Sequence, residues 1–129
     1  TGKREGLHTG LGEVSMEQVL GWDPDVLVID SGTPQAVYAD PRWKALRAVK
    51  QRRVFRQPSG VFIWDRPTAE SAVLYPLWIA CTAYPERFKD INLTTEVQRF
   101  YREVFGFRLS QTQARKVLSG GYADMAYNG

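Results

Sequence analysis

Apolar and polar residues follow two different periods along this chain. Val26–Ile29 is an unbroken apolar run, mostly β-branched, as expected of a strand that is covered on both faces. A shorter apolar pair within Arg53–Arg56 predicts a second strand. From residue 95 to residue 106 the apolar positions return every three or four residues, which is the period of an amphipathic helix. Helices alternating with strands predict an α/β fold.

Polar residues predict where the helices begin. At three places a Ser or Thr is followed three positions later by Gln, the spacing of a capping box. These pairs are Ser15 with Gln18, Thr95 with Gln98, and Ser110 with Gln113. Asp40–Pro41 predicts a further helix start, with a capping acid before a proline, and this helix carries Trp43, Leu46 and Val49. The polar segment 30–34 is expected to be a loop.

The segment from residue 68 to about residue 84 is apolar on nearly every side of a helical projection. A helix of this kind is normally buried in a core. Pro76 lies inside it and lacks a backbone N–H, so we expect the helix to kink or a new helix to begin there.

The length of 129 residues suits a single domain with a sizeable core. We expect an irregular lead-in over residues 1–14, a packed lobe over 15–120 and a loose tail over 121–129. No apolar run reaches the roughly 18 residues of a membrane span. No segment has the pattern of a secretory signal peptide.

Composition is that of an ordinary globular protein, with 43% apolar residues, 24% charged residues and a net charge of +3. This charge is too small and too scattered to make nucleic acid the default partner, and we predict no nucleic-acid binding. The alternative is a small basic nucleic-acid module in which Arg52, Arg53 and Arg56 bind phosphates and Phe55 stacks on a base. Such binding would weaken steeply with salt.

Residues that carry catalytic or metal chemistry are few. With one cysteine, Cys81, and one histidine, His8, the chain has neither an internal disulfide nor a His- or Cys-rich metal centre. We find no phosphate-binding glycine loop and no nucleophile elbow. A hydrolase built on Glu13, Glu17 or Asp65 is the alternative, but we predict that the chain is not an enzyme and needs no cofactor.

Four segments follow one another in an order that resembles one protein family. They are EVSMEQVLGWDPDVLVID (13–30), DPRWKALRAVKQRRVFRQP (40–58), FIWDRPTAESAVLYPLWIACTAYPERF (62–88) and TTEVQRFYREVFGFRLSQTQARKVL (94–118). Together they resemble the C-terminal lobe of the class III periplasmic substrate-binding proteins that serve ABC importers of iron–siderophores, haem and cobalamin.

The resemblance implies a three-layer helix/sheet/helix lobe with a small, mainly parallel sheet. In that family two such lobes close on a ligand, and the loaded protein docks on a membrane permease. A periplasmic or lipid-anchored extracytoplasmic location in a prokaryote follows from the same resemblance. The other lobe and the helix that bridges the lobes have no counterpart in this chain, so we expect a truncated lobe. Self-association would then cover the exposed sheet edge.

Two sets of residues carry over from the family. Glu17 matches the acidic position that meets permease arginines, and Glu13 is a weaker candidate for the same contact. An exposed carboxylate near a helix N-terminus is a ready partner for a guanidinium. The alternative is that Glu17 only favours the helix dipole.

The cleft of the family is lined by loops at the carboxyl ends of strands. The corresponding residues here are Phe62, Trp64 and Arg66, followed by Ser31 and His8. Alternation along this stretch would turn Val61 and Ile63 toward the core and Phe62 and Trp64 toward the cleft. The alternatives are core packing for Trp64 and a local ion pair of Arg66 with Asp65 or Glu70.

A bare metal ion would need clustered His, Cys or carboxylate ligands, which this sequence does not offer. We therefore predict a chelated or large ligand, such as a ferric siderophore, haem or a corrinoid. A molybdate- or tungstate-type oxyanion held by hydrogen bonds is the alternative.

Overall fold

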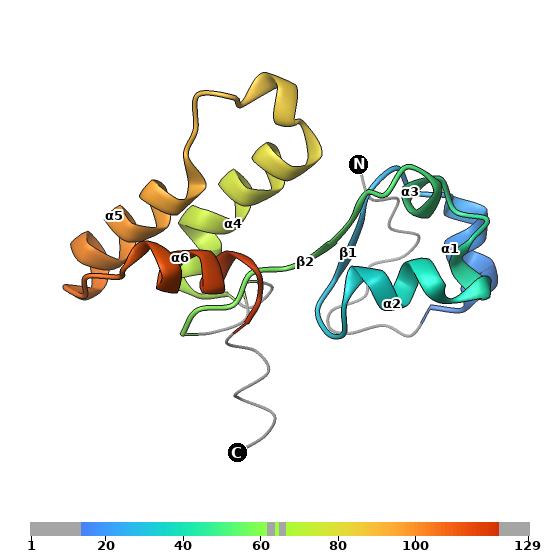
Figure 1. Cartoon of the computed structure of the whole chain (residues 1–129), viewed down its shortest axis with the longest axis horizontal. Helices are drawn as coiled ribbons and strands as arrows, with labels where there is room; N and C mark the ends of the chain where they lie inside the picture. Colours follow the sequence, from blue (N-terminus) through green and yellow to red (C-terminus); the bar gives the residue numbers. More distant parts are fainter. Residues whose placement is uncertain (1–13, 62–63, 65–66, 122–129) are drawn as a thin grey trace, which may run out of the picture. The chain divides into compact units, whose positions relative to one another are not determined.

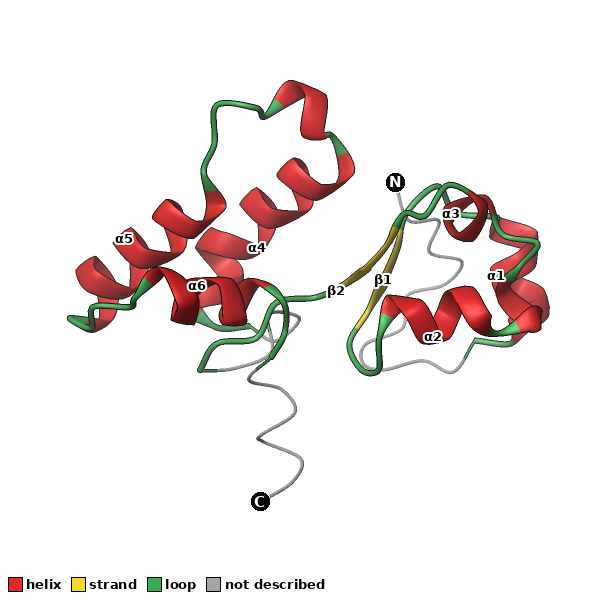
Figure 2. Ribbon diagram, in the orientation of Figure 1, coloured by secondary structure: helices red, strands yellow, loops and turns green. Residues whose placement is uncertain are grey.

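The computed structural model describes residues 14–61, 64 and 67–121 (Figure 1). It divides into two compact units. Unit 1 holds the described residues up to Val28 together with Thr33–Phe55, and unit 2 holds Ile29–Gly32 and the described residues from Arg56 onward. Helices dominate the described residues, and the strands are short (Figure 2). Among these residues no helix has the length and apolar character that a membrane crossing requires.

Two short strands form a parallel sheet. β1 (Leu27–Ile29) pairs with β2 (Val54–Arg56). The Leu27 N–H donates to the Arg53 carbonyl at 3.0 Å, and the Gln57 N–H donates to the Ile29 carbonyl at 2.9 Å. From the first of these hydrogen bonds to the second, the residue numbers increase on both strands, so the strands run parallel. The small parallel sheet of the predicted fold class is therefore confirmed. All of β1 is half-buried, so the expectation of a strand covered on both faces was wrong for this chain.

Unit 1 contains α1 (Met16–Trp22), α2 (Pro34–Ala39), the 3-10 helix η1 (Pro41–Trp43) and α3 (Arg47–Lys50). Among the residues of unit 1 that the structure describes, four apolar residues are buried and form its core: Leu46, Ala48, Val49 and Val54. The capping box of Ser15 and Gln18 is confirmed at the start of α1.

The helix predicted from residue 40 onward is divided into η1 and α3. Asp40 caps η1 as expected, because its carboxylate accepts from the Arg42 N–H at 3.0 Å. Leu46 then takes an extended backbone conformation (φ −69°, ψ 138°) while its side chain is fully buried. Burial of Leu46 therefore overrides the helical spacing of the sequence.

Helix α2 was missed at sequence level, where residues 30–34 were assigned to a loop. Its first turn is held by Thr33, whose hydroxyl accepts from the Ala36 N–H at 3.2 Å. Pro34 follows at the first helical position, where a missing N–H costs nothing. The pair Thr33–Pro34 was the sequence signal for this helix.

Unit 2 contains α4 (Ala69–Ala83), the 3-10 helix η2 (Pro85–Arg87), α5 (Leu93–Phe105) and α6 (Gln111–Leu118). α4 packs on α5, and α5 packs on α6 (Figure 1). Seven apolar side chains of these helices are buried: Leu74, Trp78, Val97, Phe100, Tyr101, Ala114 and Val117. The capping box of Ser110 and Gln113 at the start of α6 is confirmed.

The structure corrects the expected start of α5 and the expected burial of α4, and it excludes one of the two alternatives for Pro76. α5 begins at Leu93 rather than Thr95, because the Asn92 side chain accepts from the Thr95 N–H at 3.1 Å and so caps the helix earlier. α4 is a single helix that contains Pro76, so no new helix begins there. α4 is also not buried on all sides in this chain, since Val73 is 57% exposed.

Candidate functional site

The candidate binding site lies where the two strands end. Since β1 and β2 are parallel, their following segments leave the sheet at the same edge. After β1 comes Asp30–Gly32, in which Ser31 is exposed. After β2 comes the segment Gln57–Thr68, which we call the β2–α4 loop. This loop begins with Gln57, Pro58 and Ser59, all of them buried. The predicted cleft residue Ser31 thus lies in unit 2 with this loop.

Trp64 is the one predicted cleft residue of the β2–α4 loop that the structure describes. It is 1% exposed, and its backbone N–H donates to the Pro58 carbonyl at 3.3 Å. Its buried indole N–H finds no acceptor among the described residues. Buried polar groups nearly always have a partner, so this donor is an exception that needs a reason. The role of Trp64 at a ligand stays a prediction.

The expected alternation along this stretch was wrong at Val61, and the burial of Trp64 fits the alternative of core packing. Val61, expected to face the core, is 60% exposed, whereas Trp64 is buried. Gly60, Val61 and Trp64 lie in bends and turns rather than in a strand, so the two-residue period does not apply to these described residues. The other predicted contacts, His8, Glu13, Phe62 and Arg66, lie outside the described residues.

A buried carboxylate contacts the start of the β2–α4 loop, a role that the sequence did not indicate, since it offered Glu70 only as a possible ion-pair partner of Arg66. Glu70, in the first turn of α4, is 1% exposed. Its Oε1 accepts from the Val61 N–H at 3.1 Å and from the hydroxyl of Tyr101 on α5. The Tyr101 hydroxyl also accepts from the Val61 N–H at 3.3 Å. We call these two side chains with the Val61 N–H the Glu70–Tyr101 clamp.

The sequence carried only a faint signal of the clamp. Glu70 looks like an ordinary acid near a helix N-terminus, where it favours the helix dipole. Tyr101 falls on the apolar stripe of α5, where an aromatic residue is expected in the core. Their meeting depends on how α4 packs on α5, and no local pattern encodes that contact.

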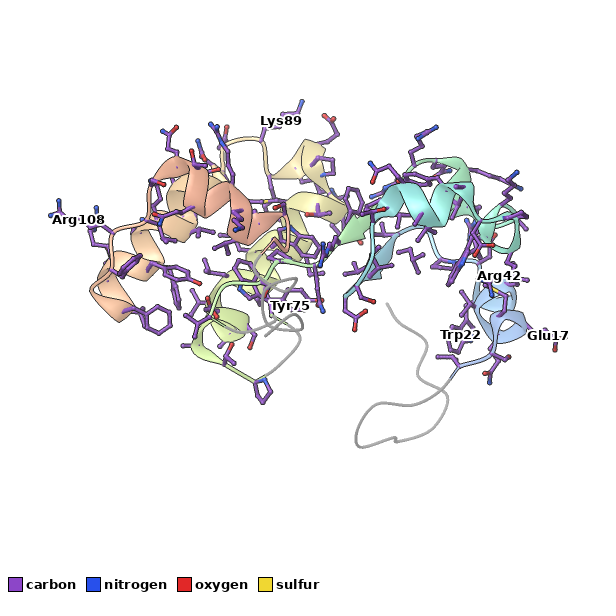
Figure 3. The ribbon with its side chains drawn as sticks, turned by 60° about the horizontal axis from the view of Figure 1, so that its bottom comes forward. Glu17, Trp22, Arg42, Tyr75, Lys89 and Arg108 are labelled. Atoms are coloured by element: carbon purple, nitrogen blue, oxygen red, sulfur yellow. The ribbon has the colours of Figure 1, made fainter. Side chains whose placement is uncertain are left out.

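The predicted docking residue Glu17 lies in the first turn of α1 and is exposed. Figure 3 shows it projecting outward from the helix, with Trp22 on the same short helix. Trp22 is itself 43% exposed. α1 therefore presents an acid and an aromatic residue to solvent, and docking by Glu17 stays a prediction.

Asp23 fixes the C-terminal end of α1. It takes the left-handed conformation (φ 41°), and its carboxylate accepts from the Arg47 N–H and from the Arg47 Nε, each at 2.8 Å. Arg47 also pairs with Asp25 at 3.0 Å. The pKa of Asp23 is lowered below its ordinary value of 3.8, mainly by the hydrogen bond from the Arg47 backbone N–H and to a smaller extent by the hydrogen bond from the Arg47 side chain.

The described residues offer no site for a bare metal ion, and one candidate phosphate ligand contacts an aromatic ring. No group of three His, Cys, Asp or Glu residues among them is placed to hold a metal ion. Burial raises the pKa of the Cys81 thiol, which keeps it protonated and unreactive. Arg52, a candidate phosphate ligand, lies over the Tyr38 ring at 5.0 Å instead.

Comparisons with known proteins give the fold a context. No family model matches the chain. The chain is 32% identical over 99 residues to the molybdate-binding protein MolA of Haemophilus influenzae, which covers 74% of this chain and 28% of MolA. The structure of this chain is similar to that of an ABC transporter solute-binding protein from Sulfurospirillum deleyianum, with 34% identity and a TM-score of 0.72. That match covers 84% of this chain and 34% of the other.

The chain has the fold of one lobe of a periplasmic solute-binding protein. A periplasmic solute-binding protein from Veillonella parvula matches with 28% identity and a TM-score of 0.72, over 84% of this chain and 36% of the other. Helicobacter pylori CeuE with Ni(II) bound matches with 26% identity and a TM-score of 0.61, over 82% and 34%. The predicted resemblance and fold class are thereby confirmed.

The chain spans about a third of the length of the relatives it matches. These relatives are a molybdate-binding protein and solute-binding proteins by their names.

Proposed function

We propose that this chain forms one lobe of the solute-binding component of an ABC importer. In this role it works on the extracytoplasmic side of the membrane and delivers its ligand to a permease. The observation that carries the proposal is the match of 84% of the chain to solute-binding proteins at a TM-score of 0.72. The two loops at the carboxyl ends of β1 and β2 would supply this lobe's half of the cleft.

Two classes of ligand are consistent with the described residues, and both avoid a bare metal ion. A metal chelate, such as a ferric siderophore, haem or a corrinoid, would meet the aromatic and guanidinium groups of Phe62, Trp64 and Arg66. A tetrahedral oxyanion would instead be held by hydrogen-bond donors.

The oxyanion has the more specific support. MolA, the relative with 32% identity, is a molybdate-binding protein. The indole N–H of Trp64 is a buried donor without an acceptor among the described residues, so it would contribute to an oxyanion site only where ligand binding uncovers it. Ser31, exposed after β1, would add a hydroxyl donor from the neighbouring loop.

Permease docking is proposed for the exposed face of α1, through Glu17 and with Glu13 as a second acid. Support comes from the exposed position of Glu17 in the first turn and from the Asp23–Arg47 contacts that hold the other end of α1. A carboxylate held in this way can form a bidentate pair with an arginine.

Calorimetric titration of the complete protein tests the ligand. Molybdate and tungstate form one arm, ferric siderophores, haem and corrinoids form the second, and sulfate is the control anion. Binding in the first arm supports the oxyanion, and binding in the second supports the chelate. If no member of either class binds, the proposed ligand classes are wrong.

Trp64→Phe sharpens the same experiment because it keeps an aromatic ring and removes the N–H. For an oxyanion we expect affinity to fall about tenfold, the value of one buried hydrogen bond. Trp22→Phe on the exposed face of α1 is the matched control and should leave affinity unchanged. Equal affinity in both variants would remove Trp64 from the oxyanion site.

A further inference from the structure

The β2–α4 loop is tied to each of the helices α4, α5 and α6. The Ser59 N–H donates to the Val117 carbonyl of α6 at 3.0 Å. The Val61 N–H donates to Glu70 of α4 at 3.1 Å and to Tyr101 of α5 at 3.3 Å. The exposed part of the loop is therefore anchored on the packed helices of unit 2 rather than left as a free surface loop.

If Glu70 served only to fill space beneath the loop, a carboxylate would be an unfavourable choice. Glu70 is 1% exposed, and an ionised side chain loses its hydration when it is buried. An apolar residue of similar volume would fill the same space without that cost, and such replacements are often neutral or stabilising. What the carboxylate adds is direction, because its contacts include one backbone N–H of the loop and one hydroxyl, both of which it accepts from.

Gly60 shows how closely the loop approaches the clamp. A Cβ added at this position would overlap both the Tyr101 hydroxyl and the Glu70 carboxylate. Only a residue without a side chain lets the backbone come this near to the two oxygens. The loop is thus fitted to the clamp at two consecutive residues, Gly60 and Val61, directly before the predicted ligand contacts.

We propose that Glu70 and Tyr101 are positioning residues that fix the backbone of Gly60 and Val61 and, through it, the place of Trp64 in the β2–α4 loop. The proposal rests on the proposed function, since the loop carries the predicted contacts Phe62, Trp64 and Arg66. Neither positioning residue touches the ligand. Both act through the backbone of Gly60 and Val61, and they remove the cost of ordering the loop when ligand arrives.

Fluorine NMR of the chain labelled with 5-fluorotryptophan tests the local part of the proposal. Trp64 reports the loop, Trp78 reports α4, and Trp22 and Trp43 report unit 1. In Tyr101→Phe we expect the Trp64 signal to shift or broaden while the other three stay in place. Glu70→Gln, which keeps the shape of the side chain, should have the same effect. Tyr84→Phe removes an exposed tyrosine hydroxyl and should change none of the four.

Two results of this experiment overturn the proposal. One is a Trp64 signal that stays unchanged in both clamp variants. The other is a joint change of the Trp64 and Trp78 signals, because a general loosening of unit 2 is a structural effect and not a positioning one.

Titration of the complete protein with molybdate and with a ferric siderophore tests the functional part. For whichever probe binds, we expect Tyr101→Phe to weaken binding about tenfold and Tyr84→Phe to leave it unchanged. Unchanged binding in Tyr101→Phe, together with an altered Trp64 signal, overturns the link between clamp and ligand. If the unaltered protein binds neither probe, the proposed ligand classes fail, and the NMR result still decides whether the clamp holds the loop.

Discussion

The missing side chain of Gly60 decides how the β2–α4 loop meets the helices. Because the backbone carries only hydrogen there, the loop reaches the Glu70 carboxylate and the Tyr101 hydroxyl together. A glycine in a loop is usually explained by its backbone angles. Here it is explained by space, since Gly60 is absent from the glycines with positive φ.

Gly60→Ala should therefore destabilise unit 2. We expect the free energy of unfolding to fall by about 1–3 kcal/mol, the usual cost of forcing extra atoms into a packed site. Urea unfolding followed by circular dichroism measures it. Gly21→Ala in α1 is the matched control, because nothing lies within 4 Å of its added Cβ. An equal loss in both variants would contradict the tight approach at Gly60.

Asp23 gives unit 1 a pH-dependent contribution to stability. Its pKa is lower in the folded state than its ordinary value of 3.8, so folding releases protons from this group. The stabilisation is present above 3.8 and is lost as the pH falls through the lowered pKa. Asp23→Asn should therefore be less stable than the unaltered chain near neutral pH, and the difference should shrink in acid.

Urea unfolding at a series of pH values from neutral to strongly acidic tests this prediction, with Trp22 and Trp43 as probes in unit 1. Asp90→Asn, at an exposed position before α5, controls for the general loss of a negative charge. A difference between Asp23→Asn and the unaltered chain that stays constant with pH would show that the carboxylate charge plays no part.

At the scale of elements, α4 stays helical although it contains a proline, which is disfavoured in the interior of a helix. Pro76 lies within Ala69–Ala83, where it cannot donate to the Ala72 carbonyl. The helix persists because its start is capped and residues on both sides of the proline are buried. Thr68 and Ser71 form a capping box at the start, and Leu74 and Trp78 are buried on either side of the proline.

Pro76→Ala should stabilise unit 2. Restoring the helical hydrogen bond should raise the free energy of unfolding by up to about 3 kcal/mol. The greater conformational entropy of the unfolded chain without proline lowers it by about 1 kcal/mol. We expect a net rise of about 1–2 kcal/mol in the free energy of unfolding, measured by urea denaturation. Pro85→Ala is the control, because Pro85 begins η2, and a residue at that position needs no backbone N–H for the helix. Equal effects would contradict a penalty located inside α4.

At the scale of the whole molecule, the two-stranded sheet leaves one side of each strand unpaired within the described residues. Unpaired strand edges invite pairing with another chain. The relatives are about three times as long as this chain, so they bring further structure to the same fold.

We expect the 129-residue chain to self-associate as its concentration rises. Sedimentation velocity over a range of concentrations should show a rising sedimentation coefficient for the chain and a constant one for the complete protein. A monomer at all concentrations would show that the strand edges are protected by other means.

Helix starts at Ser15, Asp40 and Ser110 could be predicted from the sequence because capping depends on residues three positions apart. The same holds for the strands, whose apolar runs are local. The start of α5 was misplaced because Asn92 and Thr95 both suit a cap, and only the folded helix shows which one accepts. The candidate loop could be located from its place after β2, but its side-chain directions could not.

The sequence by itself determined most of the helix starts, the two strands and the similarity to one lobe of a solute-binding protein, since these follow from periodicity and from recognisable segments, whereas α2 and the division between η1 and α3 did not. Only the tertiary structure decided that Trp64 is buried, that Val61 is exposed and that Glu70 meets Tyr101 beneath Gly60. The physical reason is distance along the chain. Glu70 and Tyr101 are 31 residues apart, and no local propensity reports which buried acid will find which hydroxyl.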